Sequence, residues 1–133
     1  NDNIEPFERR VINDLGIAEA RLAEVSADPA GAAKALVNGW ARQFELLLVH
    51  IDLDVLDFAD MPLAENTRRN TGLRFDQLIE ALGPLISAPN WAALTICELN
   101  PDHGESDGST LQKFSAVLAK TLASSPRWGE STG

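Results

Sequence analysis

The sequence of 133 residues contains only one cysteine, Cys97. A single cysteine excludes a disulfide framework and a cysteine-rich zinc module, and it is typical of a reducing compartment such as the cytoplasm. Basic residues are also scarce, with 11 Lys and Arg against 20 Asp and Glu and a formal net charge of −9. Nucleic acids and anionic membranes need a basic surface, so this balance argues against both as partners. It suits a site that collects cations.

Long apolar runs are lacking too. The longest, LLLV at residues 46–49, is broken by His50 and Asp52 and is far too short to span a bilayer. The first ten residues, NDNIEPFERR, carry charges where a secretory signal would be apolar, and they do not begin with Met. We therefore expect a processed product or a piece of a longer protein.

The composition, 44% hydrophobic and 23% charged, is that of one ordinary globular domain. Hydrophobic periodicity predicts helices at 5–15, 29–43, 75–86 and 109–123, and strands at 17–25, 46–51 and 91–99. The strand at 46–51 has no polar alternation, which predicts that both of its faces are covered. The alternation predicts an α/β fold with a parallel sheet flanked by helices. We expect residues 1–125 to form this domain and 126–133 to be a frayed tail.

Two of the predicted strands end in carboxylates. Asp52, Asp54 and Asp57 follow the strand at 46–51, and Glu98 ends the strand at 91–99. The carboxyl ends of parallel strands meet at one edge of the sheet, where ligands bind. Carboxylates gathered there repel one another unless a divalent cation or a cationic substrate lies between them. In the structural alternative, the aspartates cap a turn and Glu98 pairs with an arginine at position 68 or 69.

The stretch HIDLDVLD at residues 50–57, followed by a long turn and by ICELNP at residues 96–101, resembles the arginase/agmatinase (ureohydrolase) family. In that family a D-x-D-x-x-D stretch supplies ligands to a two-manganese centre, and a later E-x-N-P supplies the glutamate that holds the guanidinium of the substrate. The resemblance implies the C-terminal half of an arginase-like α/β/α domain. It also implies a hydrolase of C–N bonds in arginine-, agmatine- or hydroxyarginine-like substrates that releases urea or a related product.

By this resemblance, Asp52 corresponds to the aspartate that bridges two Mn²⁺ ions, and Asp54 to a terminal ligand of the second ion. Glu98 corresponds to the catalytic glutamate that binds the guanidinium, and Asp57 to a third, more structural aspartate. The family's metal-binding histidine and Asp-x-His-x-Asp motif have no match before residue 46. The resemblance therefore implies that a missing N-terminal half or a partner chain supplies the other ligands, and that this chain alone is inactive. An oligomer is expected.

The chain departs from the family in places. Phe58 stands where Pro is usual, and MPLAENTRRNTGL replaces a Gly-rich turn. In that turn Glu65 and Asn66 are expected to contact the polar end of the substrate, unless the loop is simply solvated. His50, where Ser is common, is expected to be a hydrogen-bonded structural residue or a neighbour of the metal ligands. His103 is expected to be a loop residue, with a role near Glu98 as the alternative.

Cys97 is expected to pack in the core.

Two other interpretations of the function stay open. In the first, the Asp52-x-Asp54 pair after an apolar strand resembles the nucleophile motif of haloacid-dehalogenase-type phosphatases. That chemistry needs a downstream Lys and an acidic pair, but Lys113 and Lys120 both fall on the last predicted helix and no Asp-Asp pair follows, which disfavours it. The other interpretation is a non-catalytic, truncated hydrolase half that acts in assembly.

Overall fold

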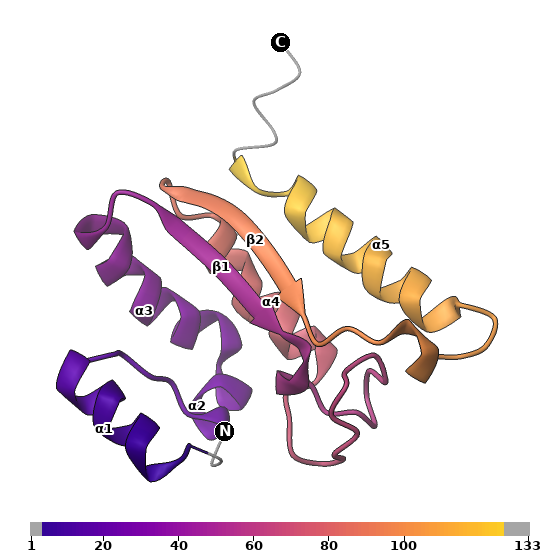
Figure 1. The fold of residues 1–133 in the computed structure, drawn as a ribbon. Helices are drawn as coiled ribbons and strands as arrows, with labels where there is room; N and C mark the ends of the chain where they lie inside the picture. The colour runs from indigo at the N-terminus through magenta and orange to yellow at the C-terminus, as the bar shows by residue number, and fades with distance from the viewer. Residues whose placement is uncertain (1–3, 127–133) are drawn as a thin grey trace.

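The computed structural model describes residues 4–126 of the chain. Within that range three helices precede the first strand, and from there on strands and α-helices alternate (Figure 1). The elements are α1 (Pro6–Leu15), α2 (Leu22–Ala27), α3 (Pro29–Gln43), β1 (Leu47–Asp52), the 3-10 helix η1 (Leu53–Val55), α4 (Phe75–Ile86), β2 (Trp91–Cys97), the 3-10 helix η2 (Pro101–His103) and α5 (Ser109–Ala123). Apart from its first residue, the predicted tail at 126–133 lies outside the described residues. No helix in the described part is long and apolar enough to cross a membrane.

The sheet consists of β1 and β2, which run parallel. His50 pairs with Thr95, and Asp52 pairs with Cys97, so both strands end at the same edge. The chain passes from β1 to β2 through α4, which gives the βαβ unit that a parallel pair requires. The expected α/β class, a parallel sheet flanked by helices, is confirmed.

Side chains from neighbouring segments fix where α3 and α4 begin. Oδ1 of Asp28 accepts a 2.9 Å hydrogen bond from the Gly31 amide, which caps α3. At α4, Oδ2 of Asp60 accepts a 2.7 Å bond from the Phe75 amide. Because Asp60 belongs to the loop after β1, this bond also ties that loop to the helix.

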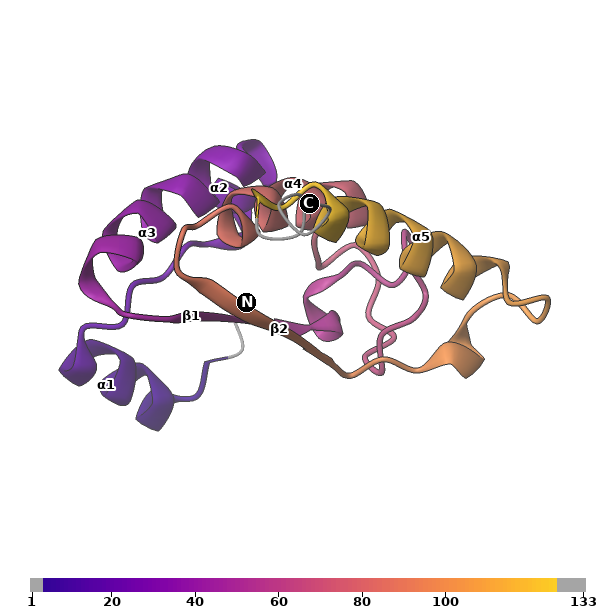
Figure 2. The same ribbon diagram turned by 90° about the horizontal axis from the view of Figure 1, so that it is seen from above.

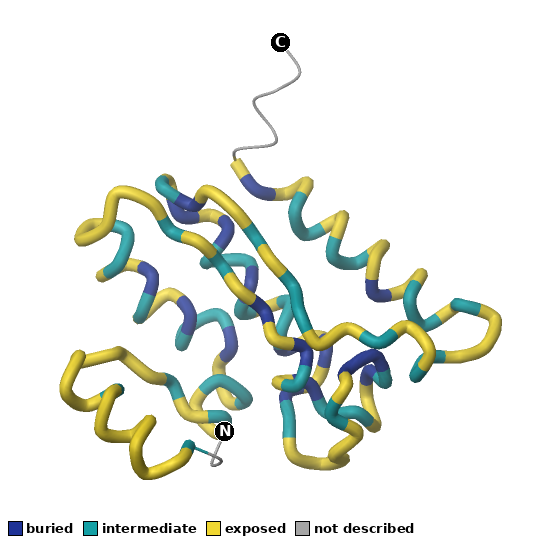
Figure 3. Tube along the Cα trace, in the orientation of Figure 1, coloured by how far each residue is buried: buried dark blue, intermediate teal, exposed yellow. Residues whose placement is uncertain are grey.

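The helices form a layer on one side of the sheet. Figure 2 shows α3, α4 and α5 on one side and α1 on the other. The core includes residues of the sheet, of these three helices, and of η1 with the loop that follows it. Figure 3 shows buried positions along α3 and α4 and in that loop. Members of the core include Val37, Ile51, Leu82, Ile86, Trp91 and Phe114.

Helix α1 is formed but buries none of its residues. It ends at Gly16, which has a φ of +62° that favours glycine. Phe7, Val11 and Leu15 recur every four residues and therefore lie on one face, yet each is exposed. The apolar stripe of α1 has no partner among the described residues.

The predicted strand at 17–25 is wrong, because the structure has an irregular segment followed by α2. Leu22 and Val25 are three residues apart, which is a helical spacing. The Arg21 amide donates a 2.9 Å bond to Oε2 of Glu24, so the first turn of the helix is capped locally. This capping outweighs the weak apolar alternation of the segment.

The prediction that both faces of the strand at 46–51 are covered is also wrong. Val49 and Ile51 face the helices, whereas Leu48, His50 and Asp52 alternate with them and are exposed. Leu48 is 74% exposed. The outer face carries one apolar residue, Leu48, beside the polar His50 and Asp52, and the described part of the chain places α3, α4 and α5 on the other face only.

Candidate metal and guanidinium site

Asp52 and Asp54 lie where β1 turns into η1. Oδ1 of Asp52 accepts a 2.9 Å hydrogen bond from the Asp54 amide, which starts the 3-10 turn. Oδ1 of Asp54 in turn accepts a 2.8 Å bond from the Asn66 amide, twelve residues away. Within residues 4–126 these bonds use only Oδ1 of each carboxylate, so Oδ2 of each is left for a ligand.

Glu98 comes directly after β2 and has a left-handed backbone, with φ +53°. For a residue other than glycine this conformation costs on the order of 1 kcal/mol. Two backbone hydrogen bonds offset the cost: the Glu65 amide donates to the Glu98 carbonyl (3.0 Å), and the Asn100 amide donates to the Leu63 carbonyl (2.7 Å). The loop after β1 therefore holds the turn that carries Glu98.

The pKa of the Cys97 thiol is raised by its surroundings. Desolvation raises its pKa first, and the negative charges of Asp52, Glu98 and Asp54 raise the pKa further. Asp52 is paired with Cys97 in the parallel sheet, Asp54 follows two residues after Asp52, and Glu98 follows Cys97. The three residues therefore belong to the same edge of the sheet.

Asp57 forms hydrogen bonds with the backbone of the loop after β1. Its Oδ1 accepts a 2.9 Å bond from the Ala59 amide, and its own amide donates a 2.8 Å bond to the Leu73 carbonyl. A Cβ on Gly72 would lie 2.4 Å from the Leu56 carbonyl carbon, so only glycine permits this close approach of the two segments. These contacts tie Asp57 to the loop backbone; the more structural role that the resemblance implies for it stays a prediction.

The structural alternative was that the aspartates cap a turn and that Glu98 pairs with an arginine. Its first part agrees with the structure, since each aspartate accepts a hydrogen bond from a backbone amide of a turn or loop. The alternative does not describe Glu98. In the described residues, the ion pairs are Arg9–Glu19 and Arg74–Asp76, and neither includes that glutamate. Nor do residues 4–126 contain a group of three His, Cys, Asp or Glu side chains arranged to hold a metal. The site is partial in this range.

His50 and Cys97 lie on the exposed face of the sheet. Nδ1 of His50 is 2.7 Å from Oγ1 of Thr95, and Nε2 is 3.4 Å from Sγ of Cys97. His50 is therefore a hydrogen-bonded strand residue, one of its two expected roles. The expectation that Cys97 packs in the core is wrong, because its thiol is beside His50 and only half-buried.

The turn residues Glu65 and Asn66 reach the site through their backbone amides, which bond Glu98 and Asp54. The Asn66 side chain bonds the Arg68 amide at 3.0 Å, and Glu65 is exposed. Their contact with substrate stays a prediction.

Sequence reasoning missed most of the part played by His103. Its Nδ1 is 2.8 Å from the Ala64 carbonyl, across 39 residues of sequence. Asn100, next to it, accepts a 3.0 Å bond from the Asp102 amide and so shapes the turn. The residue spacing gave no signal for the contact with Ala64, because it depends on how the two loops meet.

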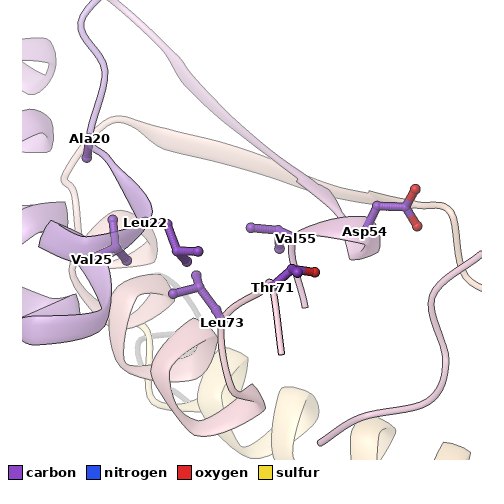
Figure 4. A pocket seen from close by; sticks show the side chains of 7 residues that line it. All are labelled: Ala20, Leu22, Val25, Asp54, Val55, Thr71 and Leu73. Carbon is purple, nitrogen blue, oxygen red and sulfur yellow. The ribbon is translucent and has the colours of Figure 1, made fainter. Parts of the chain in front are cut away.

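A small cavity of about 100 Å³ lies behind η1. Figure 4 shows that Val55, Leu22 and Leu73 face it, whereas the carboxylate of Asp54 points away. The lining is largely aliphatic, and its polar members are Asp54 and Thr71.

A sequence model described as the arginase family matches residues 2–125. The chain belongs to the arginase family. This match covers nearly all of the sequence, which settles the family that the two acidic motifs predicted. No curated protein matches the chain in a sequence search.

Solved structures of the same fold include arginases and formiminoglutamases. The formimidoylglutamase of Bacillus subtilis has a TM-score of 0.74 at 18% identity over 92% of this chain, and the arginase of Bacillus caldovelox has 0.71 at 20% over 97%. A Trypanosoma cruzi formiminoglutamase with Mn²⁺ has 0.67 at 20% over 92%. The chain spans 39%, 41% and 42% of these three structures respectively. It therefore corresponds to less than half of such a domain.

Proposed function

We propose that this arginase-family chain supplies part of the active site of a binuclear-manganese hydrolase that cleaves C–N bonds of guanidino or amidino substrates. The observation that carries the proposal is that Asp52, Asp54 and Glu98 stand at or directly after the carboxyl ends of the two parallel strands, within a chain of this family. The substrate class follows from the family, whose solved members include arginases and formiminoglutamases.

The two carboxylates of Asp52 and Asp54 are suitable ligands for manganese. Carboxylate, carbonyl and water ligands suit Mn²⁺, and Asp52 and Asp54 each have one carboxylate oxygen left by their turn hydrogen bonds. One structural relative is described with Mn²⁺. Asp52 and Asp54 would hold the metals, which when bound activate water for hydrolysis. With only two such ligands, the site needs donors from outside residues 4–126.

Glu98 would bind the cationic end of the substrate. A carboxylate accepts paired, charge-assisted hydrogen bonds from a guanidinium, which fixes the position of its carbon. The backbone bonds from the loop to the turn of Glu98 hold that carboxylate in place. Positioning of this kind makes attack on the bound substrate effectively intramolecular.

The partner we propose is the rest of an arginase-family domain, on the same chain or on another one. The chain spans about 40% of its structural relatives, and the outer face of β1 leaves Leu48 exposed. The apolar stripe of α1, with Phe7 and Leu15, is exposed too. Covering these side chains would bury apolar area and bring in the missing ligands.

The remaining alternatives differ in support. The incomplete donor set favours a non-catalytic subunit as the second candidate, in which Asp52 and Asp54 only shape the turn. The phosphatase interpretation has lost its basis, because the chain belongs to another family.

The test uses the complete, Mn²⁺-loaded assembly. Asp52→Asn keeps the acceptor for the Asp54 amide but removes a charge, so metal content and turnover of guanidino substrates should fall together. Glu98→Gln should keep the metal and lose about tenfold to a hundredfold in kcat/KM, because charge-assisted hydrogen bonds are lost. Asp107→Asn, at the start of α5, is the matched control.

A substrate panel of arginine, agmatine, hydroxyarginine and formimino compounds identifies the reaction. Full metal content and full turnover in Asp52→Asn would refute its role as a ligand. Absence of turnover on every substrate in a metal-loaded assembly would support the non-catalytic subunit.

A further inference from the structure

The imidazole of His103 lies between the two loops of the candidate site. Its Nδ1 is 2.8 Å from the Ala64 carbonyl, and its Nε2 is 3.4 Å from Nδ2 of Asn100. A carbonyl oxygen can only accept a hydrogen bond, so Nδ1 carries the proton. In the neutral ring Nε2 is then the acceptor for the Asn100 amide group. The orientation of the ring and its tautomer are both set by these contacts.

Packing holds the same ring from the side. The rings of Phe58 and His103 meet edge to face, with centroids 5.6 Å apart and an interplanar angle of 76°. The guanidinium carbon of Arg69 lies 5.6 Å from the Phe58 centroid. His103 therefore contacts a stack that reaches both ends of the loop after β1.

The contacts of His103 surround the turn of Glu98. Ala64 forms an antiparallel bridge with Leu99, and the Glu65 amide bonds the Glu98 carbonyl. The hydrogen bond from His103 reaches the carbonyl of Ala64, which directly precedes the Glu65 amide. Without it, only backbone bonds and packing would hold the loop against a turn that is strained by its positive φ.

We propose that His103 is a positioning residue for Glu98. It clamps residues 63–65 to the turn after β2, and so keeps the carboxylate of Glu98 where a guanidinium can meet it. This inference rests on the proposed function, because it assigns Glu98 to the substrate. It assigns no proton transfer to His103.

Three variants test it in the complete, Mn²⁺-loaded assembly, with L-arginine and agmatine as the probes. His103→Asn places an amide nitrogen near the position of Nδ1 and keeps the bond to Ala64. His103→Leu keeps much of the volume and loses both bonds, and His103→Gln stays polar but moves its amide away from Ala64. Hydrogen–deuterium exchange follows the amides of Glu65 and Asn100, and steady-state kinetics separates KM from kcat.

We expect His103→Leu and His103→Gln to raise KM about five- to tenfold, with kcat changed less, as for the loss of one hydrogen bond. Exchange at the Glu65 and Asn100 amides should accelerate by a similar factor. His103→Asn should stay within about twofold of the parent in both measurements. Metal content should not change in any variant, because His103 touches neither Asp52 nor Asp54.

The outcomes separate this inference from the proposed function. If Glu98→Gln lowers kcat/KM but neither His103→Leu nor His103→Gln raises KM, His103 does not position Glu98 and the proposed function stands. If His103→Asn is as impaired as His103→Leu, the bond to Ala64 is not the cause and the inference is overturned. If Glu98→Gln has no effect on either probe, both the guanidinium role and its positioning by His103 are refuted.

Discussion

The amide of Asn66 donates a hydrogen bond to Oδ1 of Asp54, so the long loop after β1 returns to the carboxylate that follows the same strand. The next residue back, Glu65, bonds the turn after β2. One short piece of loop thus contacts both motifs of the candidate site. The loop is part of the site's frame, which explains why a long, polar segment is ordered here.

The Asn66–Asp54 bond predicts different effects for two substitutions of Asp54. Asp54→Asn keeps an acceptor for the amide, so the free energy of unfolding should change by less than about 0.5 kcal/mol. Asp54→Ala leaves the amide unpaired and should lower it by about 1–2 kcal/mol. Urea unfolding measures both values. Equal stability of the two variants would show that this hydrogen bond contributes nothing.

The isolated 133-residue chain should bind Mn²⁺ weakly and have no turnover. Two aspartates with one free oxygen each cannot complete the coordination of two ions, and residues 4–126 hold no group of three donors. Calorimetric titration with Mn²⁺ measures this. Tight binding of two ions per chain would contradict the prediction and show that the chain is self-sufficient.

The positive φ of Glu98 predicts a conflict between stability and function. Glu98→Gly should be about 1 kcal/mol more stable than Glu98→Ala, because only glycine adopts this backbone conformation without strain. Both variants lose the carboxylate, so both should lose guanidinium binding. Thermal unfolding of the pair measures the difference. If Glu98→Ala equals or exceeds Glu98→Gly, the strain is absent in solution.

The single cysteine allows the carboxylate cluster to be probed chemically. Because burial and the charges of Asp52, Glu98 and Asp54 raise the pKa of Cys97, its thiolate fraction near neutral pH is low and its alkylation should be slow. Raising the pH should speed the reaction. Glu98→Gln should lower the pKa of the thiol and speed it at fixed pH.

Alkylation by iodoacetamide, followed by mass spectrometry, measures these rates. Asp107→Asn is the control, because that carboxylate is not among the groups that raise the pKa of Cys97. A rate unaffected by Glu98→Gln, with exposure of the thiol unchanged, would place the carboxylate too far away to act on it.

Local signals were enough to predict four of the five α-helices in the described residues; the exception is α2, which was predicted as a strand. Asp28 before Pro29 marks the start of α3, and the structure has the helix over Pro29–Gln43. The same holds for α4 and α5, whose apolar faces recur at helical spacing. The predicted strands at 46–51 and 91–99 are followed by an acidic residue or have one near their end, and they were predicted to be parallel. These two signals predicted that Asp52 and Glu98 lie at one edge of the sheet.

The strand predicted at 17–25 fails for a local reason, because a cap by Glu24 favours a helix. The other features that sequence reasoning missed depend on contacts between distant segments. The uncovered face of β1 could not be seen, because Leu48 looks the same whether this chain or another covers it. His103 and Ala64 meet only after both loops have formed.

The two-stranded sheet has a consequence for the chain on its own. Within the described residues β1 and β2 each have a neighbour on one side only, so both are edge strands with backbone N–H and C=O groups free to pair with another chain. Natural sheets blunt such edges with charges or proline, yet the only acidic or basic residue among Leu47–Asp52 besides His50 is the terminal Asp52. Such edges favour strand-to-strand aggregation of the chain on its own. The partner proposed above would cover them, so we expect production of the protein to succeed best when that partner is present while the chain folds.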